Sequence, residues 1–491
     1  MIISTGIFKG IRPKTASHLL ENNEAQTAQN CKLYSGSLMP WYNKQEIVEL
    51  ELTVSILTIY YYLSSDWFEF SAEVDIVEGP VASDTANKRY YTGDGIPKKT
   101  NETEATTGSG AMPINFYPMQ VPVPETALTA TPSGSGGTGD DRDVTYVWTV
   151  VTSWGEEGPP SDASTIVQAK NGETVNLSGM DLTWQAGTAY TLDHWVIPTS
   201  LGDYVYKCTT AGTSGGAEPS PWGTTVDGNT SDGTCVWRCY KKGILYDSGG
   251  GKRIYRSAVG YDSANYRYLT QIAMATTAYA DSTTDTNLGE IATVLDYISP
   301  PDTLIGLVGL SNGISAGFVG KDIYFSEPYY PHAFTENTLS LTESIVGLGV
   351  VGSTTVALTD GHPYVIPGSS PESMTPNKLP DIAPCMSKKG IVSCRFGVIF
   401  PTANGLYMID GVQGQLLTKD IVTKNEWDDY YPSTMHGHFH DNKYIGFYKS
   451  GSNEGGIVYD LTNNVFTTLD FYATAAYTDP TTDIFYYNLE T

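Results

Sequence analysis

The chain has 491 residues, of which 50 are Gly, 27 are Pro and 34 are Tyr, and only 17% are charged. This mixture is typical of turn-rich β structure and disfavours a coiled coil, a collagen or an ordinary helical bundle. The net charge of −26 excludes a surface that binds phosphate over its whole extent, although an acidic lumen would let a DNA duplex slide without sticking.

The sequence shows no signal for export or for membrane insertion. It has no apolar run of the roughly 18 residues that a spanning helix needs. Residues 1–10 lack the basic region and apolar block of a secretory signal peptide. The six cysteines are sparse and predict a reduced protein made in the cytoplasm. We expect Cys208 and Cys235 to be small apolar residues on neighbouring strands, with a zinc site or a disulfide as the less favoured alternative.

Residues 1–120 are expected to consist mainly of short strands. A turn or two of helix fits 16–30, and the partial alternation of apolar and polar residues over 47–63 predicts a strand. The stretches 100–111 and 131–141 are rich in Thr, Ser and Gly. This composition predicts loops or linkers.

A β-sandwich is predicted in the middle of the chain. Residues 144–151 alternate well and lead into a Gly-Glu turn followed by Pro and Ser, an order common in fibronectin type III-like modules. Further strand-like runs follow at 253–257 and 266–279. We therefore predict a fibronectin-like domain in two parts, 121–182 and 242–289.

Residues 183–241 lie between these two parts and are predicted to form a small inserted β module. The module contains four of the nine tryptophans, Trp184, Trp195, Trp222 and Trp237. Indole faces stack on the apolar faces of sugar rings, which makes these residues candidates for glycan stacking. The alternative is that so small a module needs its aromatic residues simply to form a core.

Residues 290–491 return to short strands in which similar aromatic cores recur. These cores lie at 322–326, 405–409, 443–448, 456–460 and 483–487. Two to four strands in every ~40–50 residues is the spacing of β-propeller blades, although a sandwich would give much the same local pattern. The predicted fold is therefore all-β: a propeller built from 1–120 and 290–491, with the sandwich and the aromatic module inserted.

Three of the seven histidines, His436, His438 and His440, alternate along one predicted strand. Their side chains would share one face, where two or three imidazoles could bind zinc or iron. No acidic or cysteine motif accompanies them, so ordinary histidines on a sheet face are the favoured interpretation. The sequence also contains no Ser nucleophile elbow, and carboxylate pairs carry no weight in a chain with 54 acidic residues. We therefore predict no cofactor and no enzymatic activity.

The order and spacing of several short stretches resemble those of phage virion tail proteins, most closely the tail nozzle (tail tubular protein B-like) of short-tailed phages. The stretches include Gly10-Ile-Arg-Pro13, Trp67-Phe-Glu-Phe70, Arg89-Tyr-Tyr-Thr-Gly-Asp-Gly95, Ile323-Tyr-Phe-Ser-Glu-Pro328, Pro331-His332, Thr359-Asp-Gly-His-Pro-Tyr364, Gly405-Leu-Tyr407 and residues 479–486. Each motif is weak alone, but the resemblance spans nearly the full length outside 183–241.

The resemblance implies a propeller with inserted domains and a ring-shaped homo-oligomer, in such nozzles a hexamer, through which the genome leaves the capsid. It implies a place in the virion tail, assembly in the bacterial host cytoplasm, and contacts with a tail adaptor protein and with tail fibre or spike proteins. Double-stranded DNA would pass through the channel without specific binding. An alternative of a different class is a peripheral tail component that binds host-surface glycan through 183–241.

Overall fold

The computed structural model describes residues 7–34, 37–41, 44–63, 66–82, 84–200, 204–241, 250–257 and 265–489. The structure is 46% strand and 5% helix, which confirms the all-β prediction. Among the described residues, no helix has the length and apolar character needed to cross a membrane. The chain divides into two compact units: unit 1 comprises Met1–Asn115, Pro301–Tyr329 and Asn337–Thr491, and unit 2 comprises Phe116–Pro300 and Tyr330–Glu336.

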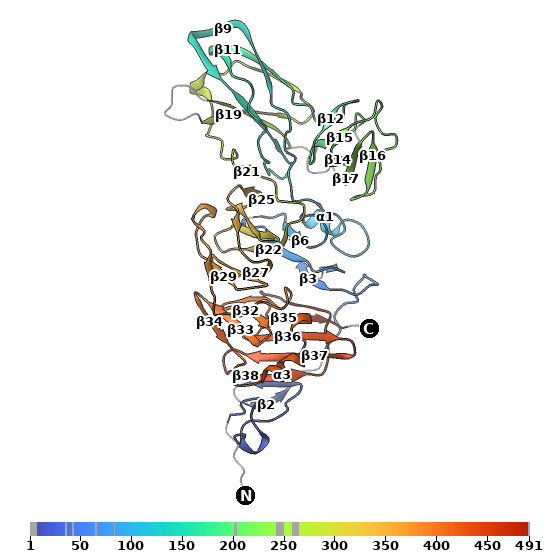
Figure 1. Ribbon diagram of the computed structural model, residues 1–491. Coiled ribbons are helices and arrows are strands. Elements are labelled where there is room, and N and C mark those ends of the chain that lie inside the picture. Colours follow the sequence, from blue (N-terminus) through green and yellow to red (C-terminus); the bar gives the residue numbers. More distant parts are fainter. Residues whose placement is uncertain are drawn as a thin grey trace. The chain divides into compact units, whose positions relative to one another are not determined.

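Unit 1 is a series of small antiparallel sheets (Figure 1). They are β5-β6-β7 (Asp75–Glu78, Arg89–Thr92, Lys98–Thr100), β22-β23-β24-β26 (Ile305–Gly309, Ser315–Val319, Asp322–Glu327, Leu339–Ser340), β27-β28-β29-β30 (Ile345–Val351, Thr354–Thr359, Tyr364–Ile366, Asn377–Lys378), β31-β32-β33-β34 (Val392–Cys394, Gly397–Thr402, Gly405–Asp410, Gln413–Leu416) and β35-β36-β37-β38 (His436–His440, Lys443–Ser450, Asn453–Asp460, Val465–Leu469). Three hairpins accompany them: β1-β2 (Cys31–Tyr34, Ser37–Pro40), β3-β4 (Thr58–Leu63, Asp66–Phe70) and β39-β40 (Ala475–Thr478, Phe485–Asn488). The short helices are η1 (Ser17–Leu19), α1 (Glu102–Thr106), η3 (Pro371–Ser373), α3 (Lys424–Asp428) and η4 (Pro432–Thr434).

The sheets that contain β28, β32 and β37 pack face to face because β32 is apolar on both sides. All six residues of β32 are buried. Val398 and Phe400 on one face join a cluster that contains Val356 of β28. Ile399 on the opposite face joins a second cluster that contains Ile457 of β37. Alternate residues of one strand therefore bind its sheet to the sheets on either side, as the two-residue period of a strand requires.

Neighbouring sheets of unit 1 also contact one another through their first strands. β5 contacts β22, β22 contacts β27, β27 contacts β31, β31 contacts β35, and β35 contacts β39, which in turn contacts β3. Four of the aromatic cores that the sequence predicts as strands lie in β24, β33, β36 and β37, which confirms those strands, and the fifth, 483–487, overlaps β40, which begins at Phe485.

Two predictions for the start of the chain are wrong in detail. The predicted strand over 47–63 begins only at Thr58. The preceding segment leaves the sheet because the Glu69 carboxylate accepts the backbone N–H groups of Glu51 (3.0 Å) and Leu52 (2.8 Å), which replaces ladder hydrogen bonds. The helical turns expected within 16–30 are reduced to a single 3₁₀ turn, η1.

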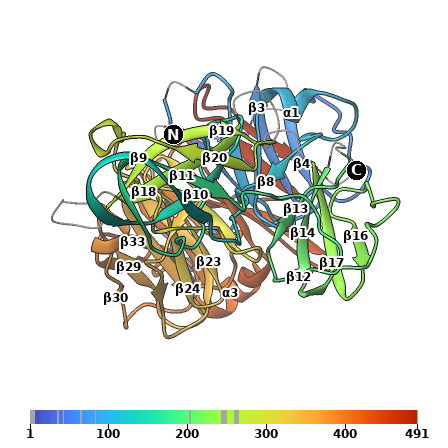
Figure 2. The same cartoon turned by 90° about the horizontal axis from the view of Figure 1, so that it is seen from above.

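Unit 2 contains a sandwich and a smaller module (Figure 2). The sandwich sheets are β10-β18-β19 (Tyr146–Val151, Gly251–Ser257, Tyr266–Ala273) and β9-β11-β20 (Thr129–Val144, Val167–Ser178, Ala278–Asp281). The module sheets are β12-β15 (Ala189–Tyr190, Gly212–Thr213) and β13-β14-β17-β16 (Trp195–Val196, Tyr204–Thr210, Cys235–Lys241, Asn229–Asp232). β8 (Tyr117–Pro118), η2 (Asp285–Asn287) and the pair β21 (Tyr297–Ile298) and β25 (Tyr330–Thr335) complete unit 2.

Strand β10 is buried on both faces, and its two faces meet different parts of unit 2. On one face, Tyr146 Oη donates to the buried carboxylate of Asp281 on β20 (3.0 Å), which links the two sandwich sheets. On the other face, Val147 joins an apolar cluster that includes Tyr297 and Ala333. Residues around 292–297 and 330–336 therefore belong to unit 2, although the sequence analysis assigns all of 290–491 to the propeller.

The predicted loop at 131–141 is wrong, because these residues are part of β9, which pairs with β11. The register is interrupted at two places, where β9 carries extra residues. Gly137 has φ +77°, a conformation that favours glycine, and a Cβ there would lie 2.9 Å from the backbone nitrogen of Glu173. The glycines therefore serve bulges in a strand.

Candidate functional site

A cavity lies in unit 1 where several sheets converge. Its volume is about 320 Å³, near the lower limit of ordinary small-molecule sites, about 300–1,000 Å³. We call it the unit 1 cavity. It is lined by residues in or directly before the first strands of several sheets, namely 57–60 (β3), 73–76 (β5), 388, 389 and 391 (before β31), 436 and 438 (β35), and 475–477 (β39).

An ion pair occupies one side of the unit 1 cavity. Lys388 Nζ lies 2.6 Å from Asp75 Oδ2, and the backbone N–H of Gly306 donates to the same carboxylate (3.2 Å). Burial raises the pKa of Asp75, while the Lys388 cation acts in the opposite direction. The charges of Lys388 and Asp75 therefore cancel each other, and their contacts connect the segment before β31 to β5 and β22.

Lys389 lies beside the histidine strand. Its backbone carbonyl accepts from Gly437 N–H of β35 (2.9 Å). Its Nζ donates to the carbonyl oxygen of Leu57 (2.7 Å). No carboxylate of the described residues forms an ion pair with Lys389, and burial lowers the pKa of this ammonium.

The three predicted histidines share one face of β35, as the sequence predicts. His436 Nε2 lies 2.7 Å from the carbonyl oxygen of Ala473, so this nitrogen carries the hydrogen, because a carbonyl only accepts. His436 Nδ1 then accepts from His438 Nε2 at 2.9 Å. His440 is separate: its ring stacks on Phe485 at 5.6 Å.

The hydrogen bonds of this strand oppose metal binding. Both ring nitrogens of His436 are engaged, and the described residues contain no group of three or more His, Cys, Asp or Glu placed to hold a metal ion. Burial, and then the nearby Lys389 cation, lowers the pKa of His436 to about 4. Burial and the same cation, together with His436, lower the pKa of His438 well below its usual value. Both imidazoles are therefore neutral at pH 7.

The four candidate tryptophans are mainly core residues of the aromatic module. Trp184, Trp195 and Trp237 are only 5%, 5% and 0% exposed, so none of them presents a free ring face to a sugar. Trp184 Nε1 and Trp237 Nε1 both donate to Oδ2 of Asp232, at 2.7 and 3.0 Å. Trp222 is half-buried, with its ring 4.2 Å from that of Tyr206. For three of the four, the core interpretation replaces glycan stacking.

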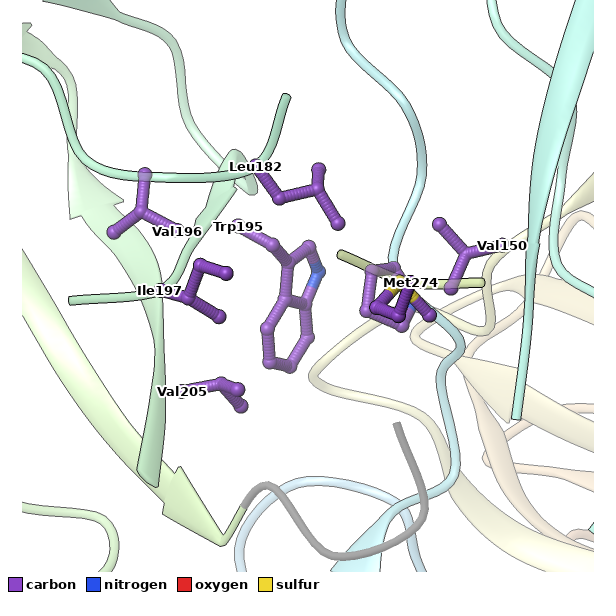
Figure 3. A pocket seen from close by; sticks show the side chains of 8 residues that line it. Val150, Leu182, Trp195, Val196, Ile197, Val205 and Met274 are labelled. Carbon is purple, nitrogen blue, oxygen red and sulfur yellow. The ribbon is translucent and has the colours of Figure 1, made fainter. Parts of the chain in front are cut away.

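Trp195 joins the module to the sandwich within unit 2. Figure 3 shows its ring beside Ile197 and Val205 of the module and Leu182 just before it, with Val150 and Met274 of the sandwich on the other side. The space left between them is about 10 Å³, which is the room of one water molecule. Trp195 is therefore an apolar anchor between two parts of unit 2.

The buried cysteines of the module agree with the sequence analysis. Cys208 on β14 and Cys235 on β17 are 0% and 1% exposed, and they lie on neighbouring strands of one sheet. Both belong to the apolar cluster around Trp237. Burial raises the pKa of Cys208 to about 11, which keeps this thiol protonated and unreactive.

Comparisons with known proteins identify no family. No family model and no curated protein matches the chain. Among solved structures, a Bacteroides fragilis protein described as exported is 9% identical, with a TM-score of 0.24 over 58% of this chain and 79% of the other. Apo AztD from Citrobacter koseri is 12% identical, with a TM-score of 0.25 over 66% and 94%. PorZ, a surface component of the type-IX secretion system of Porphyromonas gingivalis, is 12% identical, with a TM-score of 0.19 over 85% and 50%. Scores this low carry no argument about fold or function.

Sequence reasoning identified His436 and His438 but missed Lys388, Lys389 and Asp75. One signal was present: Lys388 and Lys389 are adjacent in a chain with only 28 basic residues. Their partners, however, lie more than 300 residues away in the sequence, at positions 57 and 75. A local pattern cannot show that these strands meet at one cavity.

Proposed function

We propose that this chain is a structural subunit of a phage tail, a nozzle protein that forms a ring-shaped channel for the genome. The main support for this proposal is the position in the fold of the stretches that resemble tail nozzle proteins. Residues 67–70 lie in β4, Arg89–Thr92 is β6, 323–327 lie in β24 and 405–407 lie in β33. Apart from Pro331-His332, every resembling stretch quoted above belongs to unit 1. The resemblance therefore follows one compact scaffold.

We further propose that the sheets of unit 1 are the blades of a propeller. The contacts of first strands run from β5 through β22, β27, β31, β35 and β39 to β3. Thr58 of β3 brings this series back to its start, because its Oγ1 donates to Ala72 O (2.8 Å) and accepts from Val74 N (3.1 Å), just before β5. Residues in or directly before five of these first strands, β3, β5, β31, β35 and β39, line one cavity, as blades around a common axis would.

The net charge of the chain supports a channel through which DNA passes more than a surface that binds DNA. A ring of identical subunits multiplies the net charge of −26, and phosphates are repelled by such a surface. A homo-oligomeric ring, a hexamer in this proposal, needs the tail adaptor on one side and fibres or spikes around it. In this proposal the insertions of unit 2 supply surface for such partners, while unit 1 supplies the repeated body.

Cryo-electron microscopy of virions that carry this chain is the test. The expected map contains a closed ring of copies below the portal and adaptor, with a bore that admits a DNA duplex, about 20 Å across, and acidic side chains facing it. The same map tests the propeller, because the sheets of unit 1 must surround one axis. Copies placed singly at the periphery, with the aromatic module outward and no shared channel, would refute the nozzle proposal.

The attachment alternative is left with Trp222, the half-exposed tryptophan of the four candidates. Its indole Nε1 donates to Glu218 Oε1 (3.0 Å), which fixes the ring on the module surface. If the chain binds host polysaccharide, the Trp222→Ala variant should lose that binding and a Trp222→Phe variant should keep part of it. If both variants bind as well as the wild-type chain, Trp222 is excluded as the contact.

A further inference from the structure

The unit 1 cavity contains an ammonium group, that of Lys389, which forms no direct ion pair with a carboxylate of the described residues. Lys388 is paired with Asp75, whereas the hydrogen bond of Lys389 Nζ goes to a neutral carbonyl, that of Leu57. Glu73 also lines the cavity, but its side chain is exposed and forms no ion pair with either lysine in the described residues. Glu73 and Asp75 therefore act on the Lys389 ammonium only through space, where they raise its pKa against the effect of burial, and Lys389 Nζ has no carboxylate as a direct partner.

The histidine strand adds polar groups but no charge beside this ammonium. His438 lines the cavity, and its Nε2 hydrogen is given to His436 Nδ1 (2.9 Å). The hydrogen-bond chain ends at the Ala473 carbonyl, which fixes both rings. In this neutral arrangement His438 Nδ1 is an acceptor, so it suits a ligand that brings a hydroxyl or an acidic proton.

We propose that the unit 1 cavity binds a small oxyanion, a carboxylate or a phosphate, with the Lys389 ammonium as its main contact. One oxygen would accept from Lys389 Nζ, and a protonated oxygen or hydroxyl of the same ligand would donate to His438. The volume of about 320 Å³ leaves space for the rest of a small organic acid. Apolar side chains of Ile59 and Ile391 complete the lining. This site is independent of the proposed nozzle function.

The ion pair makes Lys388 a weaker candidate for the same role. Its carboxylate partner already supplies the opposite charge at 2.6 Å, so a second anion would have to displace Asp75 or lie against it. Lys389 offers two remaining donor hydrogens and no competing carboxylate within ion-pair distance in the described residues. The anion is therefore expected on the Lys389 side, next to β35.

Isothermal titration calorimetry of the full chain with citrate and with inorganic phosphate tests the proposal. We expect saturable binding of at least one of them with a Kd on the order of 1 mM or tighter. Lys389→Met removes the charge and should weaken binding about tenfold or more, whereas Lys389→Arg should retain it. Lys14→Met is the matched control, because Lys14 Nζ also donates to a carbonyl, that of Lys419 (2.6 Å), but is exposed.

A second readout does not depend on the folding of a variant. In the wild-type chain with ¹³C-labelled histidine, citrate or phosphate should shift the imidazole signals of His438 and leave that of His18 unchanged; a His438→Gln variant assigns the signal. If neither anion binds up to about 10 mM, the proposal is overturned. It is also overturned if Lys14→Met weakens binding as much as Lys389→Met, because the anion then binds the surface.

Discussion

Asp232 is expected to hold the core of the aromatic module together. Its Oδ2 accepts two indole N–H groups, from Trp184 and Trp237, and its Oδ1 accepts the backbone N–H of Gly215 (2.7 Å). The carboxylate is only 5% exposed. Asp232→Ala would therefore leave three donors without an acceptor in a region that water does not reach.

The size of the effect follows from those three donors. A buried donor without a partner costs about 1–3 kcal/mol, and the relief of burying a carboxylate offsets part of the sum. We expect Asp232→Ala to lower the free energy of unfolding of the module by about 3–5 kcal/mol. Asp232→Asn keeps one oxygen for the two indoles but turns an NH₂ group toward Gly215 N–H, so we expect a loss of about 1–3 kcal/mol.

Urea unfolding of the full chain, followed by tryptophan fluorescence, measures this loss because Trp184 and Trp237 report on the module itself. Asp162→Ala removes an exposed carboxylate of unit 2 and should stay within about 0.5 kcal/mol of the wild type. A loss below about 1 kcal/mol for Asp232→Ala would show that the indole hydrogen bonds do not stabilise the module.

Two further predictions concern unit 1. His436 has a pKa of about 4 in the folded chain and an ordinary value of 6.5 when unfolded, so the unfolded state binds more protons and stability falls as the pH drops from 6.5 toward 4. At pH 5 this difference should lower the free energy of unfolding by about 2 kcal/mol. Urea unfolding should show that this loss is absent in His436→Gln and unchanged in His18→Gln. Gly93 has φ +103°, and a Cβ there would lie 2.0 Å from the backbone oxygen of Glu73, so Gly93→Ala should lower the free energy of unfolding by roughly 3 kcal/mol. Gly110 has φ +111° but nothing within 4 Å of such a Cβ, so Gly110→Ala should cost only about 1–2 kcal/mol. Equal shifts of the thermal unfolding temperature in the two variants would contradict the clash at Gly93.

Strands with short aromatic and apolar runs were predictable because such a run is a local property. β33 and β36 each carry a compact apolar run of the length that a buried strand has, and their neighbours do not have to be known. The same holds for the histidines of β35, whose shared face follows from their spacing alone. The sequence could not show that the carbonyl of Ala473 lies next to His436, and this contact decides which nitrogen of His436 carries the hydrogen.

Strand β9 could not be predicted because no local preference favours it. Its glycines have poor strand propensity, and only pairing with β11 makes the segment extended. The Glu173 carboxylate holds one bulge by accepting Gly134 N–H (2.9 Å). The opposite error occurred before β3, where a good strand sequence is held out of the sheet by the Glu69 carboxylate. In both places a buried carboxylate, which no periodicity reveals, decides the outcome.

The polar groups of this chain fall into those that stabilise the fold and those that remain available to a ligand. Asp232, Glu69 and Glu173 each accept two or more hydrogen bonds from nearby donors, so their charge is used in holding the fold. Lys389 differs because the hydrogen bond of its charged group goes to a single neutral carbonyl. Lys389 is half-buried, and partial removal of a charge from water costs free energy unless another group compensates it. The lack of a directly bonded carboxylate distinguishes Lys389 from these structural groups, and a bound oxyanion would supply one.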